Sequence, residues 1–337
     1  MNPLSSSIAV LGAGAWGTAI AILLARNGNV VHLWDNDADR LALMQLERQN
    51  RWALENIIFP ENLIVTKTLE ETVKHIQDIC LVVPSHAFRS VLNNLKPFIS
   101  QSARFVWGTK GLDPDSCELM SDVLSQVFSI KTPGAVLSGP SFAKEVALNY
   151  PSAVSLAGNN VDFLKSLVKR FSNQNFQVDL DSDMIGVQLC GVAKNVMAIA
   201  TGISDGLGFG ANTRSVLMTR GLAEISALCI ALGGEAKTVM SLAGVGDLVL
   251  TCTDNQSRNR RFGLSLAKGA SIDTTLKELG QAVEGYFNAR QLYELAKKHQ
   301  VIMPIAEAIY KILYEHHSPQ SLLNSLNSHS TNFILKE

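Results

Sequence analysis

Two stretches in the second half of the chain place a charged side chain among small or apolar residues. In "GVAKNVMAIATGISDG" (191–206), apolar residues recur at helical spacing, and Lys194 lies off that stripe among small neighbours. A bulky ligand could therefore lie beside its ammonium group, although a solvated surface lysine is the simpler alternative. In "LAGVGDLVLTC" (242–252), Asp247 is a carboxylate in an apolar segment, where an unpaired charge would be costly.

A third stretch groups arginines with amides and hydroxyls. "TDNQSRNRRFG" (253–263) brings Ser257, Arg258 and Asn259 together just ahead of a predicted helix. Such residues at a helix start can hold an anion of the size of phosphate, and the alternative is a solvated basic turn. With a net charge of −1 and a pI near 6.7, the chain as a whole does not attract nucleic acid or an anionic membrane electrostatically. Any anion must therefore be held by local groups.

The first 35 residues predict a strand, a tight turn, a helix and a second strand. The turn in "SIAVLGAGAWGTAIAILLARNGNVVHLWD" contains three glycines with separate tasks. Gly12 makes the turn, Gly14 leaves room for a pyrophosphate against bare backbone, and Gly17 lets the helix pack on the strand. This placement predicts dinucleotide binding, against the alternative that the glycines serve only packing.

The preference for NAD or NADP stays open. Asp35 follows the second strand and could accept a hydrogen bond from a ribose 2′-hydroxyl, which favours NAD. Its neighbour Asn36 could tolerate a 2′-phosphate.

More strands alternate with helical segments along the first half, in "DICLVVPSH" (78–86), "RFVWGTKGL" (104–112) and "GAVLSGPSFAKE" (134–145). This alternation predicts a parallel sheet covered on both faces. Ligands in such sheets lie beyond the carboxyl ends of the strands, so we expect Ser85, Lys110 and the "SGPS" turn to face the cofactor. A solvated loop lysine is the alternative for Lys110.

Long helical patterns replace the strands from about residue 183, in "RSVLMTRGLAEISALCIALG" (214–233), "GLSLAKGASIDTTLKELG" (263–280) and "NARQLYELAKKHQ" (288–300). The chain of 337 residues is long for one core. We predict an α/β protein with a Rossmann-type doubly wound sheet in a dinucleotide-binding domain (1–185). A mostly α-helical domain (186–330) follows for substrate binding and catalysis.

The five cysteines are scattered, odd in number and not spaced with histidines as metal ligands. They indicate thiols in a reducing cytoplasm. The start "MNPLSSS" lacks the features of a signal peptide, and no run of about eighteen apolar residues is evident. We therefore expect a soluble cytoplasmic protein without membrane insertion, metal or nucleic-acid partner.

Several motifs together resemble bacterial NAD(P)-dependent glycerol-3-phosphate dehydrogenases, in order from about residue 8 to 314. They are "GAGAWGTA", "VVPSH", "WGTKGL", "SGPSFAKE", "GVAKN", "SDGLGFGANTR", "AGVGDLVLTCTDNQSRNRRFG" and "GQAVEGY". The resemblance implies a 6-phosphogluconate-dehydrogenase-like architecture with the active site between the domains. It also implies reversible reduction of dihydroxyacetone phosphate to sn-glycerol 3-phosphate, the precursor of glycerophospholipids, with NAD(P)H.

Position by position, the resemblance implies that Lys194 is the acid/base, that Lys110 touches cofactor and substrate, and that Asp247 completes the catalytic group. The substrate contacts would be Lys110, Gly139, Ser141, Lys194, Asp247, Ser257, Arg258 and Asn259. The dinucleotide contacts would be Gly12, Gly14, Ala15, Trp16, Gly17, Asn36, Lys110, Ala143, Arg258, Ala282 and Glu284. Ala15 departs from the serine common in relatives, and the residues after Trp34 vary across the family.

A free lysine has a pKa of about 10.4, which is too high for acid/base work near neutrality. Burial and the second ammonium of Lys110 would lower the pKa of Lys194, whereas Asp247 would raise it and could hold the lysine in aim. Two other functions stay open: a related β-hydroxyacid-type dehydrogenase, and a regulator that senses NAD(H) without catalysis. A homodimer is an open alternative to a monomer.

Overall fold

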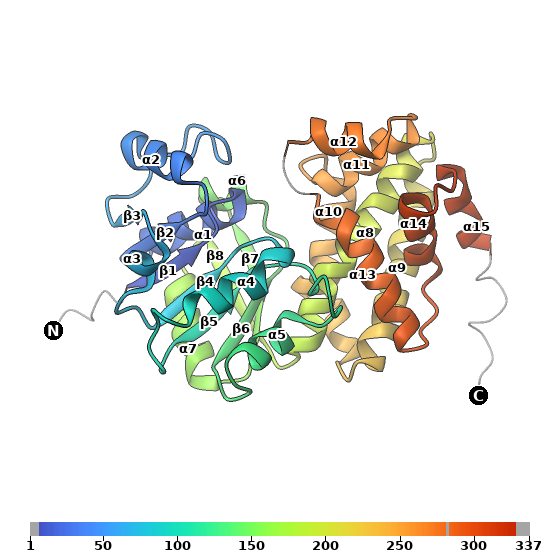
Figure 1. The fold of residues 1–337 in the computed structure, drawn as a ribbon. Coiled ribbons are helices and arrows are strands. Elements are labelled where there is room, and N and C mark those ends of the chain that lie inside the picture. Colours follow the sequence, from blue (N-terminus) through green and yellow to red (C-terminus); the bar gives the residue numbers. More distant parts are fainter. Residues whose placement is uncertain (1–6, 281–282, 328–337) are drawn as a thin grey trace. The chain divides into compact units, whose positions relative to one another are not determined.

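The computed structural model describes residues 7–280 and 283–327 (Figure 1). Contacts divide these residues into two compact units, and each is described by itself. The first unit comprises residues 7–109 and 118–184, and the second comprises residues 110–117 together with the chain from residue 185 onward. The short segment 110–117, which carries Lys110, therefore packs with the second half of the chain.

The first unit contains eight strands and seven helices in its described residues. The strands are β1 (Ile8–Leu11), β2 (Val31–Trp34), β3 (Leu63–Val65), β4 (Asp78–Leu81), β5 (Arg104–Trp107), β6 (Gly134–Ser138), β7 (Ser152–Gly158) and β8 (Phe176–Asp181). The helices are α1 (Ala15–Arg26), α2 (Ala38–Glu47), α3 (Leu69–Val73), α4 (Ser85–Leu95), α5 (Met120–Val127), α6 (Ala143–Ala147) and α7 (Val161–Phe171).

The eight strands form one sheet in the order β3-β2-β1-β4-β5-β6-β7-β8. The first six of these are parallel, which confirms the Rossmann-type sheet. The sheet departs from the predicted parallel arrangement at one place, because β7 runs antiparallel to β6 and β8 then follows β7 in parallel. The short connection from β6 through the five-residue α6 makes this reversal possible, since an antiparallel neighbour needs no full crossover.

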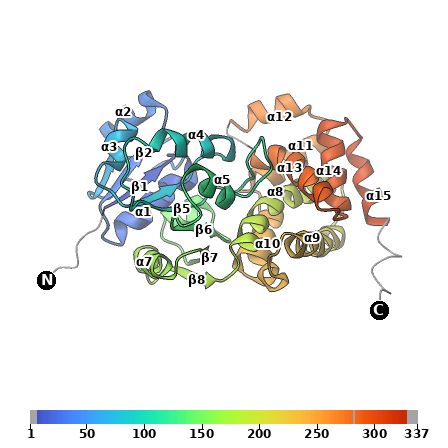
Figure 2. The same ribbon diagram turned by 60° about the horizontal axis from the view of Figure 1, so that its bottom comes forward.

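Helices cover both faces of this sheet. Helix α1 packs against α6 and α7, and α4 packs against α3 and α5. Figure 2 shows α4 and α5 on one side of the strands and α1 and α7 on the other. Helices on each face explain why β1 reads as a continuous apolar run rather than an alternating one, and why all four residues of β4 are buried.

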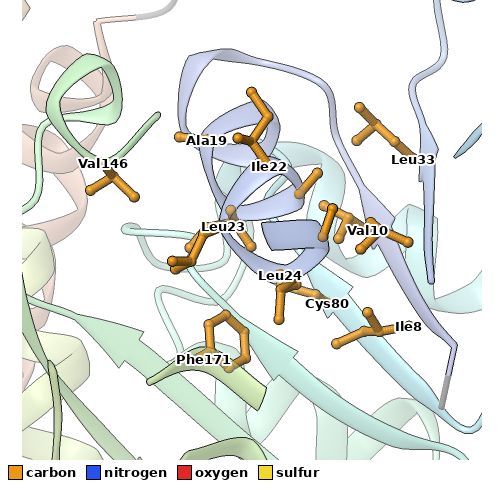
Figure 3. Close-up of a cluster of buried hydrophobic side chains, with 14 of the residues drawn as sticks. Ile8, Val10, Ala19, Ile22, Leu23, Leu24, Leu33, Cys80, Val146 and Phe171 are labelled. Carbon is orange, nitrogen blue, oxygen red and sulfur yellow. The ribbon is translucent and has the colours of Figure 1, made fainter. Parts of the chain in front are cut away.

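Helix α1 is the centre of the core of the first unit. Its residues 17–25 are all buried. Figure 3 shows Ile22, Leu23 and Leu24 of this helix amid Val10 of β1 and Phe171 of α7. Helix α1 is thus held on several sides, which fixes the glycine turn that precedes it.

The described residues of the second unit form helices joined by loops, with no strand. Its helices are α8 (Met184–Gly206), α9 (Ala211–Ala231), α10 (Asp247–Thr253), α11 (Arg258–Ala267), α12 (Ile272–Glu278), α13 (Glu284–Lys298), α14 (Pro304–Tyr314) and α15 (Leu322–Asn327), with shorter turns η1 (Ala236–Met240), η2 (Leu242–Gly246) and η3 (Pro319–Ser321). The stretch 263–280, which reads as one helical pattern, is split between α11 and α12. Gly269 at φ +88° ends the first of these helices.

Helix α8 is the core helix of the second unit. It is buried from Gly186 to Ser204 without interruption, not only along one stripe. By length and hydropathy alone this helix could span a membrane, a property the sequence reading overlooked, but 89% of its apolar window is buried inside the protein. A helix that is apolar on every side is typical of the centre of a helical domain.

Helices α8 and α11 cross at two glycines. A Cβ atom on Gly202 would come within 2.2 Å of the Arg260 carbonyl oxygen, and one on Gly263 within 2.2 Å of the Ile199 oxygen. Larger residues would force the helices apart. This close crossing brings the start of α11 beside the Lys194 region of α8.

Candidate active site

Gly12, in the turn before α1, and Gly17, in the first turn of that helix, lie so close to backbone oxygens that neither position has room for a side chain. Gly12 has φ +103°, and a Cβ atom there would lie 2.5 Å from the Val82 carbonyl oxygen. A Cβ atom on Gly17 would lie 1.8 Å from the Gly12 oxygen. These two glycines are therefore required by the fold itself, whatever the turn binds.

Gly14 is different, because the fold does not require it to be glycine. It is exposed at φ −67°, and a Cβ atom there would meet nothing within 4 Å. Gly14 is also the N-cap of α1, and no side chain caps this helix end and no acidic residue lies in its first turn. Open space in front of uncapped amides fits a phosphate group, which the helix N-terminus would attract.

Asp35 reaches back to the glycine turn. Its Oδ2 accepts a hydrogen bond from the Ala13 amide at 2.6 Å, and its Oδ1 accepts one from the Asp37 amide at 3.3 Å. The carboxylate therefore supports the turn directly, a role that sequence spacing did not suggest. Asn36 is exposed beside it.

Four other predicted ligands of the first unit, Trp16, Gly139, Ser141 and Ala143, lie shortly after strands β1 and β6. Trp16 is half-buried, and its Nε1 finds no hydrogen-bond acceptor among the described residues. A Cβ atom on Gly108 would lie 2.7 Å from this nitrogen, so Gly108 makes room for the indole. Ala143 begins α6, which packs on α1, and Ser141 donates to the Gly139 carbonyl within its own turn.

The second unit brings the three predicted catalytic residues together. Lys194 Nζ lies 2.6 Å from Asp247 Oδ1, and Lys110 Nζ lies 2.7 Å from Asp247 Oδ2. One carboxylate thus binds two ammonium groups, one on each oxygen. These residues are 53 and 137 positions apart from Asp247 in the sequence. All three belong to the second unit, and Lys194 and Asp247 are 8% and 1% exposed.

Burial and charge set the protonation of this cluster. Burial, opposed by Asp247 and reinforced by the nearby Lys110 ammonium, lowers the pKa of Lys194 to about 8. Burial works against ionisation of Asp247, but the two ammonium groups outweigh it and hold the pKa of that carboxyl below its usual range. The carboxylate therefore stays charged while Lys194 can gain or lose a proton near neutral pH.

Thr251 is a member of the cluster that the sequence reading missed. Its hydroxyl accepts from Lys194 Nζ at 3.0 Å and donates to the Asp247 carbonyl oxygen at 2.6 Å, one turn earlier in α10. Asp247 and Thr251 at i and i+4 share one helix face, a spacing that could have signalled the pair. Asp247 itself follows the π-helical turn η2, a rare geometry that is frequent at functional sites.

The basic stretch 253–263 resolves into residues with different surroundings. Ser257 is the buried N-cap of α11, and its Oγ accepts from the Arg260 amide. Arg260 is buried and pairs with Asp205 at 2.7 Å, so its charge is balanced inside the protein. Arg258 is half-buried at the helix start, where burial lowers the pKa of its guanidinium and Glu284 counteracts this.

Asn259 links the helix start to the lysine helix. Its Nδ2 donates to Asn195 Oδ1 at 2.9 Å, and its Oδ1 accepts from the Gly285 amide at 2.9 Å. Asn195 follows Lys194 directly, so Asn259 is tied to the cluster. Glu284 begins α13 near Arg258, whereas Ala282 lies outside the described residues.

Family models match both halves of the chain. Residues 7–164 match the family described as NAD-dependent glycerol-3-phosphate dehydrogenase N-terminus, and residues 183–324 match the corresponding C-terminus. The chain belongs to this dehydrogenase family. The resemblance inferred from the motifs is thereby confirmed, as is the fold class.

Individual relatives are similar over almost their whole length. The glycerol-3-phosphate dehydrogenase [NAD(P)+] of Haemophilus ducreyi is 49% identical over 95% of both chains. That of Colwellia psychrerythraea is 48% identical over 92% of this chain and 93% of its own. The crystal structure of glycerol-3-phosphate dehydrogenase from Coxiella burnetii superposes with a TM-score of 0.94 at 48% identity, over 96% of this chain and 99% of that one.

Proposed function

We propose that the protein reduces dihydroxyacetone phosphate to sn-glycerol 3-phosphate with NAD(P)H and also runs the reverse oxidation. It is an oxidoreductase of the glycerol-3-phosphate dehydrogenase family. The observation that carries the proposal is the Lys110–Asp247–Lys194 cluster, a buried acid/base of suitable pKa within a chain of this family. The product is the precursor of glycerophospholipids, which gives the reaction a biosynthetic role.

The proposed acid/base is Lys194. Reduction of a ketone requires a proton at the ketone oxygen, and an ammonium with a pKa of about 8 can release one near neutral pH. Asp247 and Thr251 fix two directions around Nζ, so the third N–H can point at substrate. Lys110 depresses the pKa of Lys194 and is also proposed to touch substrate and cofactor.

The residues of the first unit fit a dinucleotide. The open Gly14 position and the uncapped start of α1 would hold the pyrophosphate, with Ala15, Trp16, Gly17, Asn36 and Ala143 as further proposed contacts. The nicotinamide, when bound, supplies or accepts the hydride. The proposed dinucleotide-binding domain is residues 1–185, and the proposed substrate domain is residues 186–330. Within the second of these, Arg258, Ala282 and Glu284 would also contact the cofactor.

The phosphate end of the substrate is assigned to Ser257, Arg258 and Asn259, with Gly139 and Ser141 as further substrate contacts. Arg258 can offer several donors in a fixed plane, which suits phosphate. Replacing Arg258 with Ala should raise KM for dihydroxyacetone phosphate more than it lowers kcat, because a charge-assisted contact is lost. An unaltered KM would remove Arg258 from this role.

The decisive experiment is the initial rate of dihydroxyacetone phosphate reduction with NADH and NADPH in turn. Oxidation of either cofactor that depends on this substrate supports the proposal, and the ratio of the two rates gives the cofactor preference. Failure to oxidise either cofactor with small ketone phosphates would favour a NAD(H)-sensing regulator. Turnover of short β-hydroxyacids instead would favour the related β-hydroxyacid-type dehydrogenase.

We propose the cytoplasm as the compartment and small molecules as the ligands. The five cysteines, Cys80, Cys117, Cys190, Cys229 and Cys252, are thiols rather than disulfides, and four of them are buried, which fits a reducing environment. A homodimer stays a prediction, which the mass of the protein in solution would test.

A further inference from the structure

The segment that carries Lys110 is held by two buried amide side chains of helix α13. Asn288 is fully buried and Gln291 is 5% exposed, and the two lie three residues apart on one face of this helix. Neither residue is among the predicted site residues, and the hydrogen bonds of both side chains go to backbone groups. Both bind the backbone of residues 110–112.

Asn288 joins the two segments that carry the lysines. Its Nδ2 donates to the carbonyl oxygen of Lys110 at 3.3 Å and to that of Val192 at 3.4 Å, two residues ahead of Lys194. Its Oδ1 finds no donor among the described residues. The two donated hydrogen bonds are therefore what this side chain contributes.

Gln291 binds both backbone groups of a single residue. Its Nε2 donates to the Leu112 carbonyl oxygen at 3.0 Å, and its Oε1 accepts from the Leu112 amide at 3.4 Å. Leu112 is itself fully buried. A side-chain amide that pairs with both groups of one residue fixes the register of the segment, as a neighbouring strand would.

We propose that Asn288 and Gln291 are positioning residues for the reaction, which hold the backbone of residues 110–112 on α13 and α8 so that the Lys110 ammonium stays on Asp247. The proposal rests on the dehydrogenase function proposed above. Neither residue is catalytic. They act through Lys110, whose long side chain would otherwise start from a mobile loop.

We call Asn288 and Gln291 together the clamp. Loss of the clamp changes the chemistry of the cluster in a way that a general loss of stability would not. The Lys110 ammonium lowers the pKa of Lys194, and Asp247 raises it. When the Lys110 ammonium moves away from Asp247, the carboxylate pairs with Lys194 alone. The pKa of Lys194 must then rise. Reduction requires the protonated lysine, and the alkaline limb of its pH profile should therefore move to higher pH.

The test uses Asn288→Leu and Gln291→Met, which keep approximate volume and remove the hydrogen bonds. Glu294→Gln, at an exposed position on the same helix, is the matched control. We expect each clamp variant to lower kcat for dihydroxyacetone phosphate reduction by about tenfold to a hundredfold, the scale of an ångström-sized misplacement. The alkaline limb should move upward, KM for the cofactor should hold, and the control should match wild type.

A second readout does not require turnover. Trace acetylation with acetic anhydride, followed by mass spectrometry, reports the reactivity of Lys110 relative to the exposed Lys268. Lys110 should react several-fold faster in the clamp variants than in wild type. A fall in kcat without a change in either the pH limb or this reactivity would mean a merely structural role and would overturn the proposal. If wild type did not reduce the substrate, the labelling would still decide the clamp separately from the function.

A measurement on wild-type protein tests the proposal even if both variants fail to fold. Hydrogen exchange of the Leu112 amide should be slowed to the level of the α13 backbone, since Gln291 accepts from it. Exchange at the rate of an open loop would refute the clamp without any variant.

Discussion

The glycine turn of the first unit and the lysine cluster of the second are built in opposite ways. The turn uses backbone amides and missing side chains, and its three glycines lie within six consecutive residues. The cluster uses charged side chains from three segments that are distant in the sequence, and both lysines bind Asp247. A site made of backbone is encoded locally, whereas a site made of side chains depends on the packing of the whole helical unit.

The largest expected effect comes from the side-chain site. Lys194→Ala removes the proposed acid/base but leaves Asp247 paired with Lys110, so no buried charge is orphaned. We expect kcat to fall by about 10² to 10⁴, the usual range for general acid/base catalysis. Cofactor affinity, followed by fluorescence of bound NADH, should stay at the wild-type value.

The matched control is Lys268→Ala, at an exposed position of the same unit. It should turn over at the wild-type rate. If Lys194→Ala did the same, the proton would have to come from another group, and the buried cluster would be an element of stability only.

The backbone site predicts two different outcomes for two glycines of the same turn. Gly14→Ala should fold normally, because nothing lies within 4 Å of the new methyl group, yet it should weaken NAD(P)H binding by about tenfold or more, about 1.4 kcal/mol. Gly17→Ala should instead lower the melting temperature strongly, since its Cβ would lie 1.8 Å from a carbonyl oxygen.

Thermal melts and cofactor titrations of both variants measure this contrast. A Gly14→Ala protein that binds NAD(P)H as wild type does would show that the open space at residue 14 does not receive the pyrophosphate.

The pH dependence sharpens the assignment of Lys194 without any mutation. A pKa of about 8 means that the ammonium form dominates below pH 8 and the neutral amine above it. Reduction needs the ammonium, so its kcat should fall above about pH 8, by about tenfold per pH unit. Oxidation of sn-glycerol 3-phosphate needs the neutral amine and should fall below that pH.

Initial rates in both directions across pH 6 to 10 test this prediction, with saturating substrates at each point. Parallel rather than opposite slopes would point to a group other than the proton donor, such as one that binds the phosphate.

These differences explain how far the sequence could predict the molecule. The turn around Gly12, the buried strands and α1 followed from local spacing, because each depends on neighbours within one helix or strand. Asp247 and Lys194 could be marked as costly or unusual charges from their surroundings, but only the family resemblance, and not their spacing, suggested that they pair. The support of the turn by Asp35 and the contact of Thr251 with Lys194 lie in side-chain directions that spacing does not fix.

The reversal at β7 and the clamp by Asn288 were invisible for a related reason. The direction of β7 is not encoded in its own residues, because it depends on the connection that leads from β6. Asn288 reads as one polar residue in an amphipathic helix. Only its burial and its two carbonyl partners distinguish it from a surface asparagine.

The smallest expected effect on turnover is at Glu224, which separates packing of the helical unit from its chemistry. This buried carboxylate accepts from the Ile305 and Ala306 amides and so caps the start of α14. Glu224→Ala leaves both amides unpaired and should lower the free energy of unfolding by about 1–3 kcal/mol, with kcat unchanged. Glu278→Ala, at an exposed position, is the control for urea unfolding.

The sign of the pH effect at Glu224 gives a further check. Burial, opposed by the two amide hydrogen bonds, raises the pKa of Glu224 to about 7. A pKa raised above its unfolded value contributes stability that is complete at low pH and is lost as pH rises through about 7. Wild type and Glu224→Ala should therefore differ more in stability at pH 5 than at pH 8. A larger difference at pH 8 would mean that the ionised cap, not the protonated one, is the form that holds α14.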